Sequence, residues 1–421
     1  MADSAAESVD VAIVGAGLVG STLACALAAH GVRCALVDRI DPKGMTHDRF
    51  DGRASAVAAS GQRLLSAIGI WPHLAGRCEP IREIRVSDGE APLFLHYAYT
   101  DVGDEFLGTM AENRHLRAAT FARMAELSDS LTLVAPAAVS HMSENPDAAV
   151  LHLADGRRID AALVVAAEGR ESKLRDTARI AVTGWTYPQV AIVATIGHEK
   201  PHRGIAHERF LPSGPFAILP LPDDGGTHRS SLVWTERAAA AQSYLALNDA
   251  HFLAEIDERV GGFLGKLSLI GPRFSHPLGL QFAATYAKGR LALVGDAAHG
   301  IHPIAGQGLN LGYRDVAALT EVIVDARKLG LDIANPDALS RYERWRRADN
   351  LMMAGVTDLL NRLFSNDVDP IKAIRVLGLG LVHRLPPLKK LFMRHAMGTV
   401  GDLPRLMRTH QENTRTLIRA I

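Results

Sequence analysis

The sequence is poor in cysteine and carries no excess of either charge. Its three cysteines, Cys25, Cys34 and Cys78, form an odd and sparse set that provides neither a disulfide framework nor the paired spacing of a zinc site. We therefore expect reduced thiols, as in cytosolic proteins, and no metal site. Lysine plus arginine and aspartate plus glutamate both total 46. A chain without net charge has no overall field to attract nucleic acid, so we expect no nucleic-acid partner.

Long apolar runs are also absent. The first ten residues are polar and acidic and lack the basic start and apolar run of a signal peptide. The most apolar early stretch, residues 11–29, is interrupted by three glycines, and no uninterrupted run of about 18 apolar residues occurs elsewhere. We expect a cytoplasmic protein, with at most a peripheral position on the inner face of the membrane.

What is present predicts an α/β architecture with several packed lobes. Hydrophobic residues make up 48% of the 421 residues and charged residues 22%, an ordinary globular balance for a chain longer than one typical domain. Strand and helix patterns predict a Rossmann-like dinucleotide-binding domain in two parts, residues 1–179 with a small β insertion and residues 285–335. Residues 180–284 are rich in strand patterns broken by proline and glycine, which predicts an inserted, mainly antiparallel β-sheet domain for the substrate. Residues 336–421 are predicted to be helical.

A glycine-rich turn follows the first predicted strand, residues 9–14, and precedes a predicted helix over residues 21–30. The turn contains Gly15, Ala16, Gly17 and Gly20. In such a turn the first glycine allows a tight bend, the second lets a pyrophosphate approach the backbone, and the third lets helix and strand pack closely. The helix N-terminus offers free N–H groups to the phosphates. Asp38 lies 18 residues after Gly20, a spacing that suits a carboxylate on an adenosine ribose. The motif predicts a dinucleotide but does not distinguish FAD from NAD.

A second glycine-rich segment follows a strand predicted over residues 291–294. That strand would deliver Asp296 to the carboxyl end of the sheet, where a carboxylate can hold sugar or ribityl hydroxyls. The turn after it opens a helix, so backbone N–H groups point at the ligand and the helix dipole would stabilise negative charge on a reduced flavin ring. The candidate cofactor residues of this segment are Gly295, Asp296, Pro303, Gly306, Gln307, Gly308, Leu309 and Asn310.

These segments together resemble the flavoprotein monooxygenases of the para-hydroxybenzoate hydroxylase type. The resemblance is strongest to their ubiquinone-biosynthesis branch, the polyprenylphenol hydroxylases, and covers nearly the whole chain. The run most particular to that branch is HPIAGQGLNLG, residues 302–312, followed by Arg314 and Asp315. The other shared segments are Asp51-Gly52-Arg53-Ala54, Asn113 with Arg117, Ala167-Glu168-Gly169-Arg170, Glu208-Arg209-Phe210 leading to Gly214-Pro215, and Val233-Trp234.

The resemblance implies FAD as cofactor and a polyprenylated phenol of ubiquinone biosynthesis as substrate. Reduced FAD would react with O2 to give a flavin C4a-hydroperoxide that hydroxylates the aromatic ring, and NADH, NADPH or a redox protein would supply the electrons. The resemblance places Arg53 near the flavin and its pyrophosphate, Arg117 against the cofactor, Asp296 at the ribityl chain and pyrophosphate, and residues 306–310 beside the isoalloxazine ring. From the residues alone, a solvated surface charge is the other interpretation of Arg53, at the start of a helix predicted over residues 53–68, and of Arg117.

One position departs from the family pattern. The family usually has Ala-Asp-Gly where this chain has Ala167-Glu168-Gly169. Glutamate keeps the charge but adds a methylene group, so we expect a longer arm at Glu168 to shift the geometry of the electron-donor site.

The residue that helps the phenol lose its proton is not readable from the sequence. His299 and His302 flank the flavin-facing turn, and we expect both to bond to the backbone and hold the loop. Glu208 stands between His207 and Arg209 on a predicted strand, where charged side chains more often face solvent. The catalytic residue is therefore left unassigned.

The C-terminal segment, residues 371–421, is basic. It holds ten lysines and arginines and two acidic residues, Asp402 and Glu412, a balance of 10 − 2 = +8. Basic residues interleaved with apolar ones can lie on an anionic membrane surface, which suits a substrate that lives in the bilayer. A docking surface for a quinone-biosynthesis protein complex and a helical cap with a solvated face are the alternatives.

Three other functions stay open at this point. The chain could hydroxylate a small soluble aromatic compound, reduce isoprenoid double bonds with a flavin, or serve as a non-catalytic flavoprotein scaffold of a quinone-biosynthesis complex. The reductase would not consume O2 in step with product, and the scaffold would show no substrate-dependent flavin reoxidation.

Overall fold

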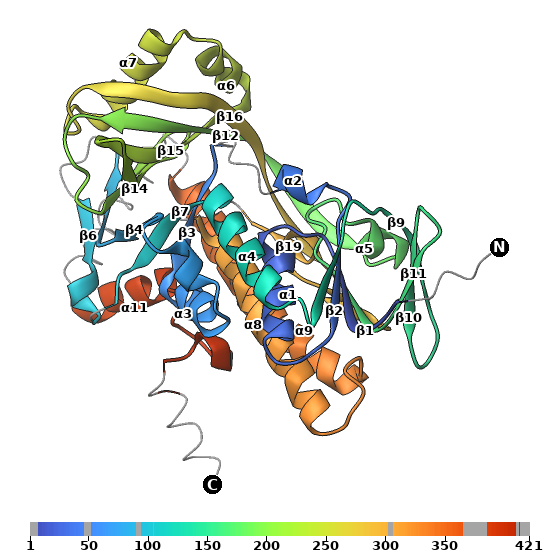
Figure 1. Ribbon diagram of the computed structural model, residues 1–421. Helices are drawn as coiled ribbons and strands as arrows, with labels where there is room; N and C mark the ends of the chain where they lie inside the picture. Colours follow the sequence, from blue (N-terminus) through green and yellow to red (C-terminus); the bar gives the residue numbers. More distant parts are fainter. Residues whose placement is uncertain are drawn as a thin grey trace.

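The computed structural model describes residues 7–45, 52–89, 94–103, 105–301, 306–364, 385–409 and 412. Within them the chain forms a largely parallel sheet, a large antiparallel sheet, a small three-stranded sheet and covering helices (Figure 1). The predicted α/β fold class is thereby confirmed.

The largely parallel sheet carries the predicted dinucleotide-binding unit. Its strand order is β17 (Ala287–Lys288), β18 (Leu291–Leu293), β11 (Arg158–Ala166), β1 (Glu7–Val14), β2 (Cys34–Val37) and β8 (Leu131–Val134), and the hairpin β9 (Val139–Glu144) and β10 (Ala149–Leu153) extends from β11. From β18 to β8 neighbouring strands are parallel. The carboxyl ends of β18, β11, β1 and β2 therefore meet at one edge of the sheet, where such sheets bind ligands.

Helices pack against both large sheets. They are α1 (Leu18–Ala28), α2 (Pro42–Met45), α3 (Ala59–Ala67), α4 (Asn113–Glu126), α5 (Lys173–Thr177), α6 (Ala238–Leu245), α7 (Asp249–Val260), α8 (Gln307–Lys328), α9 (Pro336–Phe364) and α11 (Pro386–Ala396). Short 3-10 turns occupy Trp71–Leu74, Tyr99–Asp101, Gly295–Ala297 and Arg405–Met407. Helix α8 begins directly after the second glycine-rich segment, as its pattern predicts.

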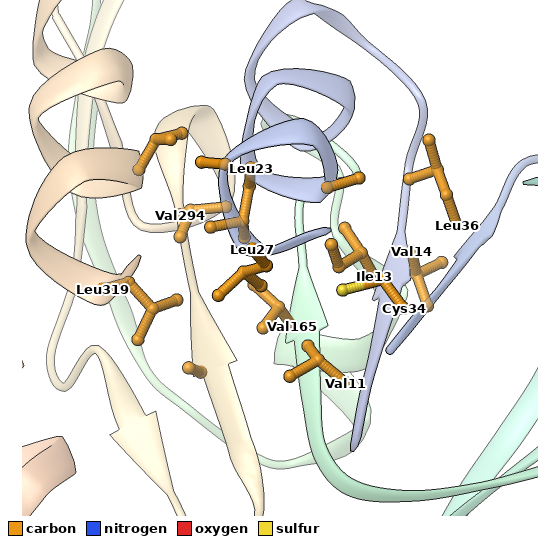
Figure 2. Close-up of a cluster of buried hydrophobic side chains, with 14 of the residues drawn as sticks. Val11, Ile13, Val14, Leu23, Leu27, Cys34, Leu36, Val165, Val294 and Leu319 are labelled. Atoms are coloured by element: carbon orange, nitrogen blue, oxygen red, sulfur yellow. The ribbon is translucent and has the colours of Figure 1, made fainter. Parts of the chain in front are cut away.

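The core lies between the parallel sheet and helices α1 and α8. Val11 and Ile13 of β1 are completely buried, in keeping with the continuous apolar runs of parallel strands covered on both faces. Figure 2 shows Leu23 and Leu27 of α1 and Leu319 of α8 in this cluster with the strand side chains. This packing fixes the position of both helix N-termini relative to the carboxyl edge of the sheet.

The large antiparallel sheet forms the second lobe. Its order is β19 (His299–Gly300), β16 (Leu267–Ala283), β12 (Val182–His198), β15 (Thr227–Arg237), β14 (Gly214–Asp224), β13 (Ile205–Leu211), β5 (Glu83–Asp88) and β6 (Phe94–Ala98). All neighbours are antiparallel except β13 and β5, which are parallel. Strands from before residue 180 and after residue 284 thus join the sheet predicted for residues 180–284, and the domain boundaries at residues 179, 284 and 335 stay predictions.

The two faces of this sheet have different neighbours. We call inner the face that carries Ala206, Glu208, Phe210, Val233 and Phe274, and outer the face that carries His207, Phe216, Ile218 and Trp234. The outer face packs against α6 and α7 in one apolar cluster (Figure 1). Ala206 of the inner face packs in a cluster with Met110 and Ala56 of the three-stranded sheet, so the inner face is turned toward the dinucleotide-binding unit.

The three-stranded sheet corrects one prediction. Its strands are β3 (Ala54–Ala58), β7 (Gly108–Glu112) and β4 (Cys78–Ile81). The helix predicted over residues 53–68 is wrong for its first part, because residues 54–58 are a strand and only α3 is helical. Ala56 pairs with Met110 of β7, so a strand partner distant in sequence overrides the helical propensity of the alanines.

Two further features bear on the sequence predictions. All three cysteines are free thiols, with Cys25 and Cys34 buried. Among the described residues, no helix combines the length and the apolar character required to cross a bilayer.

Candidate cofactor and active site

The turn between β1 and α1 is built so tightly that two of its glycines have no room for a side chain. Gly15 has φ +106°, and a Cβ atom there would lie 2.5 Å from the carbonyl oxygen of Ala167. At Gly20 a Cβ atom would lie 2.0 Å from the carbonyl oxygen of Gly15. At Gly17, by contrast, a Cβ atom would meet nothing within 4 Å. The turn therefore packs closely on the sheet behind it and leaves open space in front of the α1 N-terminus.

Asp38 is tied to this turn. Its Oδ2 accepts a hydrogen bond of 2.6 Å from the backbone N–H of Ala16, and its Oδ1 accepts one of 2.8 Å from Ile40. A carboxylate has about four acceptor positions, so Asp38 can hold the turn and still accept hydrogen bonds from a ribose. The first turn of α1 contains no acidic residue, which leaves the positive end of its dipole available to an anion.

The second glycine-rich segment lies beside the first. Val19 of α1 fits against it, since Cβ atoms at Gly295 and Gly312 would lie 3.2 and 2.6 Å from the Val19 side chain. Gly295 has φ +58°, and its N–H donates to Asp315 Oδ2 at 2.9 Å. Asp296 keeps 48% of its side chain exposed. The structure thus brings together two segments that are far apart in sequence, with the Asp296 carboxylate open to a ligand.

The start of α8 provides the second free helix N-terminus. Gly306 precedes the helix with φ +64°, and the first turn contains no acidic residue. A Cβ atom at Gly308 would meet nothing within 4 Å, while Gln307 is buried and Leu309 packs against the core. Pro303 and His302 lie outside the described residues.

Asn310 has a structural task. Its Oδ1 accepts a hydrogen bond from Ala58 N–H at 2.8 Å, and its Nδ2 donates to the carbonyl oxygens of Ala56 at 2.8 Å and Gly306 at 3.3 Å. The side chain is buried, so its amide fixes the first turn of α8 against β3. The prediction that residues 306–310 lie beside the isoalloxazine ring stays a prediction.

Arg170 is a site residue that the sequence reasoning did not assign. Its Nε donates to Asp296 Oδ2 at 3.4 Å, and its Nη2 donates to the carbonyl oxygen of Ile301 at 3.3 Å. Gln281 Nε2 donates to the carbonyl oxygens of both Arg170 and Asp296. The loops after β11 and β18 are therefore linked directly by the Arg170–Asp296 ion pair, and indirectly by Gln281 of β16, which bonds both loops. The only sequence signal was the arginine at the end of the Ala167–Arg170 segment.

The Glu168 side chain bonds to the start of α5. Its Oε2 accepts hydrogen bonds from the Ser172 hydroxyl at 2.7 Å and from Leu174 N–H at 3.1 Å. The methylene group that distinguishes glutamate from aspartate provides the reach to a helix N-terminus, where a carboxylate is favourable. The expected shift of the electron-donor site stays a prediction.

His299 is part of a buried ionic network. Its Nε2 lies 2.5 Å from Asp315 Oδ2, and Asp315 Oδ1 accepts from Arg346 Nε at 2.8 Å. Burial raises the pKa of the Asp315 carboxyl, but the charges and hydrogen bonds of His299 and Arg346 outweigh burial and lower that pKa to about 2. His299 therefore holds the loop, as expected, although through a carboxylate of α8 and not through the backbone.

The two predicted arginines are placed on separate elements. Arg53 is exposed just before β3, and its carbonyl oxygen accepts from Asn113 N–H at 2.9 Å at the start of α4. Arg117 is half-buried one turn further along α4. The contacts proposed between these arginines and the cofactor stay predictions.

The antiparallel sheet borders the site through β16, whose Gln281 bonds the loops at Arg170 and Asp296. A Cβ atom at Gly52 would lie only 2.2 Å from the Phe274 ring, so the ring packs directly on this glycine. Phe210 stacks on Phe364 of α9 with ring centroids 4.2 Å apart. Glu208 lies on the same face, and desolvation raises its pKa to about 7. Strand alternation turns Glu208 to the inner face, where its side chain is still partly exposed, so the expected solvent-facing charge holds only in part.

A cavity of about 710 Å³ opens on the outer face, between β13, β14 and the end of α7. Its lining includes His207, Glu208 and Arg209 of β13. The register turns His207 and Arg209 to the outer face and Glu208 to the inner face, and Phe263 stacks on His207 with centroids 4.4 Å apart. The β-sheet separates this cavity from the glycine turns, so the candidate active site is the inner face.

Comparison with known proteins agrees with this geometry. The profile of the FAD binding domain family matches residues 8–352. The chain is 52% identical over 408 residues to "Ubiquinone hydroxylase UbiL" of Rhodospirillum rubrum, covering 96% of this chain and 94% of the relative. It is 36% identical to "3-demethoxyubiquinol 3-hydroxylase" of Escherichia coli, covering 93% and 99%.

Solved structures share the fold at low sequence identity. The p-nitrophenol 4-monooxygenase PnpA from Pseudomonas putida superposes with a TM-score of 0.77 at 18% identity, covering 94% of this chain and all of that one. The profile match, the high identity to the curated relatives and the paired glycine turns lead to one conclusion. The chain belongs to the FAD-binding family of aromatic-ring monooxygenases that includes the ubiquinone-biosynthesis hydroxylases.

Proposed function

We propose that this protein hydroxylates the aromatic ring of a polyprenylated phenol in ubiquinone biosynthesis. The observation that carries the proposal is the 52% identity, over 96% of the chain, to a protein named as a ubiquinone hydroxylase. The electron donor would be NADH, NADPH or a redox protein.

The residues around the two glycine turns fit FAD. We call this group, Gly17, Asp38, Asp296 and Gly308, the cradle. Open space lies in front of Gly17 and Gly308, where helix N-termini present N–H groups suited to a pyrophosphate and to an anionic flavin edge. Asp38 would hold the adenosine ribose, and Asp296, oriented by Arg170, would hold the ribityl hydroxyls. FAD, when bound, supplies the redox chemistry that activates O2 for transfer of one oxygen atom to the ring.

The protein's own task is to position the ring and keep water away. The inner face carries Phe274, which is partly exposed, and Phe210, which is buried against Phe364 of α9. Aromatic rings pack favourably on such side chains, and a dry site protects a reactive oxygen species from water. The isoprenoid tail would leave along the apolar rim of this face.

The polyprenyl tail also supports contact with a membrane surface, which we propose for α11. This helix exposes Leu391 and Phe392, Leu385 is exposed just before it, and the neighbouring Lys390 and Arg394 are exposed as well. An exposed apolar stripe flanked by cations suits an anionic bilayer. Residues 365–384, 410, 411 and 413–421 of the basic segment lie outside the described residues.

Two experiments test these proposals. Purified protein loaded with FAD should convert a prenylated phenol under 18O2 to a product with one labelled oxygen atom. No conversion, or better conversion of a small soluble phenol, would contradict the proposed substrate.

Protein should sediment with vesicles containing anionic lipid and less with neutral vesicles. Phe392→Glu should weaken that binding, with Phe263→Glu on the outer cavity as the matched control. Absence of sedimentation would contradict membrane contact through α11.

A further inference from the structure

One ionisable side chain on the inner face has no protein partner. Within the described residues, the Glu208 carboxyl makes no hydrogen bond or ion pair. Solvent reaches the side chain in part, yet the surrounding protein desolvates it and raises its pKa to about 7. A desolvated carboxyl without a partner is unfavourable for folding, and such groups cluster at functional sites.

The strand register places Glu208 on a row that crosses the whole inner face. Residues opposite one another along this row are Glu208, Ala217, Val233, Val193 and Phe274. Paired residues share one face of a sheet, so Glu208 and Phe274 look the same way. Phe274 abuts Gly52, which immediately precedes Arg53 and β3. The row thus ends beside the loop that leads into β3, the strand that Asn310 bonds to the start of α8.

The surroundings of Glu208 are apolar and aromatic. Burial, and then the nearby charge of Glu208, raise the pKa of Tyr97, so the two side chains are neighbours on this face. Phe210 is the next inward residue of β13 and stacks on Phe364. A phenol ring held here would be flanked by aromatic side chains and would present its hydroxyl to a carboxyl that no other described residue engages.

Two pairs of opposite charges near this face are engaged with one another. The charged or titratable side chains on the surrounding elements are Asp88, Tyr97, Asp101, Glu112, Arg229, His276 and Lys389. Arg229 pairs with Glu112 at 3.0 Å and Lys389 pairs with Asp101 at 2.7 Å. Burial alone, and no charge among these, is the cause of the raised pKa of Glu208.

We propose that Glu208 is the catalytic residue that accepts the proton of the substrate's phenolic hydroxyl. The inference rests on the proposed function. As the ring carbon bonds to the transferred oxygen atom, the phenolic O–H bond breaks, its electron pair moves into the ring and its proton goes to the Glu208 carboxylate. When that carbon loses its hydrogen as a proton, aromaticity returns and Glu208 gives its proton back to the phenolic oxygen. The proton from carbon ends in the water formed from the second oxygen atom of O2. O2 and the reduced flavin supply the oxygen atom and the electrons.

The first test uses the FAD-loaded enzyme and three variants. Glu208→Gln keeps the shape and removes the base, Glu208→Asp keeps a base on a shorter arm, and His207→Gln changes the adjacent residue on the outer face. The active form is the carboxylate, so wild-type kcat/KM should rise with pH through about 7. Glu208→Gln should lose this rise and fall about 10²- to 10⁴-fold, the usual range for a general base. Glu208→Asp should keep the rise at a lower rate, and His207→Gln should match the wild type.

The second test needs no turnover. A prenylated nitrophenol changes its absorbance on ionisation, so its pKa can be measured while it is bound to the oxidised enzyme. A nearby negative charge disfavours ionisation of a second acid and so raises its pKa. Ionised Glu208 should therefore raise the pKa of the bound probe, Glu208→Gln should lower it, and His207→Gln should leave it unchanged.

The outcomes separate the two proposals. If the wild type hydroxylates a prenylated phenol but Glu208→Gln keeps its rate, its pH profile and the pKa of the bound probe, the role of Glu208 is overturned and the proposed function stands. If the wild type hydroxylates no prenylated phenol, the proposed function itself fails. Replacing an unpartnered, desolvated carboxyl by an amide should not weaken folding, and FAD absorbance and thermal unfolding check that the variants are intact.

Discussion

Replacing Gly17 with alanine tests where the FAD pyrophosphate lies. Gly17 has φ −66° and ψ 176°, a conformation that alanine adopts readily, and the added methyl group would meet no protein atom within 4 Å. Without FAD, the variant should lose about 1 kcal/mol of stability or less, the usual effect at a helix N-cap. The methyl group would instead point into the space assigned to the pyrophosphate.

The expected effect is on cofactor affinity. Overpacking one methyl group costs about 1–3 kcal/mol, which corresponds to FAD binding weakened about fivefold to 150-fold. Gly20→Ala is the matched comparison, because its Cβ atom would lie 2.0 Å from a backbone oxygen of the protein itself. That variant should lower the Tm of the FAD-free protein as well as the affinity.

Two assays on the apoprotein separate these effects, namely thermal unfolding and titration with FAD followed by quenching of flavin fluorescence. Gly17→Ala should change the second and spare the first. If Gly17→Ala binds FAD as tightly as the wild type, the pyrophosphate does not pass this residue and the assignment of the first glycine turn is refuted.

Further predictions concern the residues that hold the site together. Asp315→Asn removes one partner of a buried ion pair with Arg346 and should lower the free energy of unfolding by about 3–5 kcal/mol in urea titrations; a loss below 1 kcal/mol would contradict the network. Burial raises the pKa of Asp315, but the charges and hydrogen bonds of His299 and Arg346 outweigh burial and lower that pKa to about 2. Its stabilising contribution should thus be complete above about pH 4 and be lost as pH falls through about 2, a dependence that Asp315→Asn should flatten. Asn310→Ala leaves the buried Ala58 N–H without its acceptor and should cost about 1–3 kcal/mol by the same measurement. Glu168→Ala removes the carboxylate from the α5 N-terminus and should cost about 1 kcal/mol in thermal unfolding, with no effect expected on FAD affinity; a large loss of affinity would place Glu168 at the cofactor instead.

Local chemistry made the glycine turns predictable. The roles of Gly15 and Gly20 follow from steric rules that act within one strand, one turn and one helix, and the structure shows the backbone contacts that require glycine at both. The fold class follows in the same way from alternating strand and helix patterns, together with the resemblance to a known family.

Contacts between distant segments were not predictable. Residues 54–58 read as helical, since nothing local reveals that β7 supplies a strand partner for them. The ion pair of Arg170 with Asp296 and the link of His299 to Asp315 join loops that meet only after folding. Glu208 shows the same limit, because its neighbours in sequence are charged while its neighbours in space are apolar.

The most direct test of the central claim is a single-turnover reaction. The FAD-loaded protein is reduced without oxygen, mixed with a prenylated phenol and exposed to 18O2, and the product is analysed by mass spectrometry and NMR. The account predicts flavin reoxidation coupled to a ring-hydroxylated product that carries one 18O atom. Reoxidation with no hydroxylated product, or a product whose new oxygen comes from water, would contradict it.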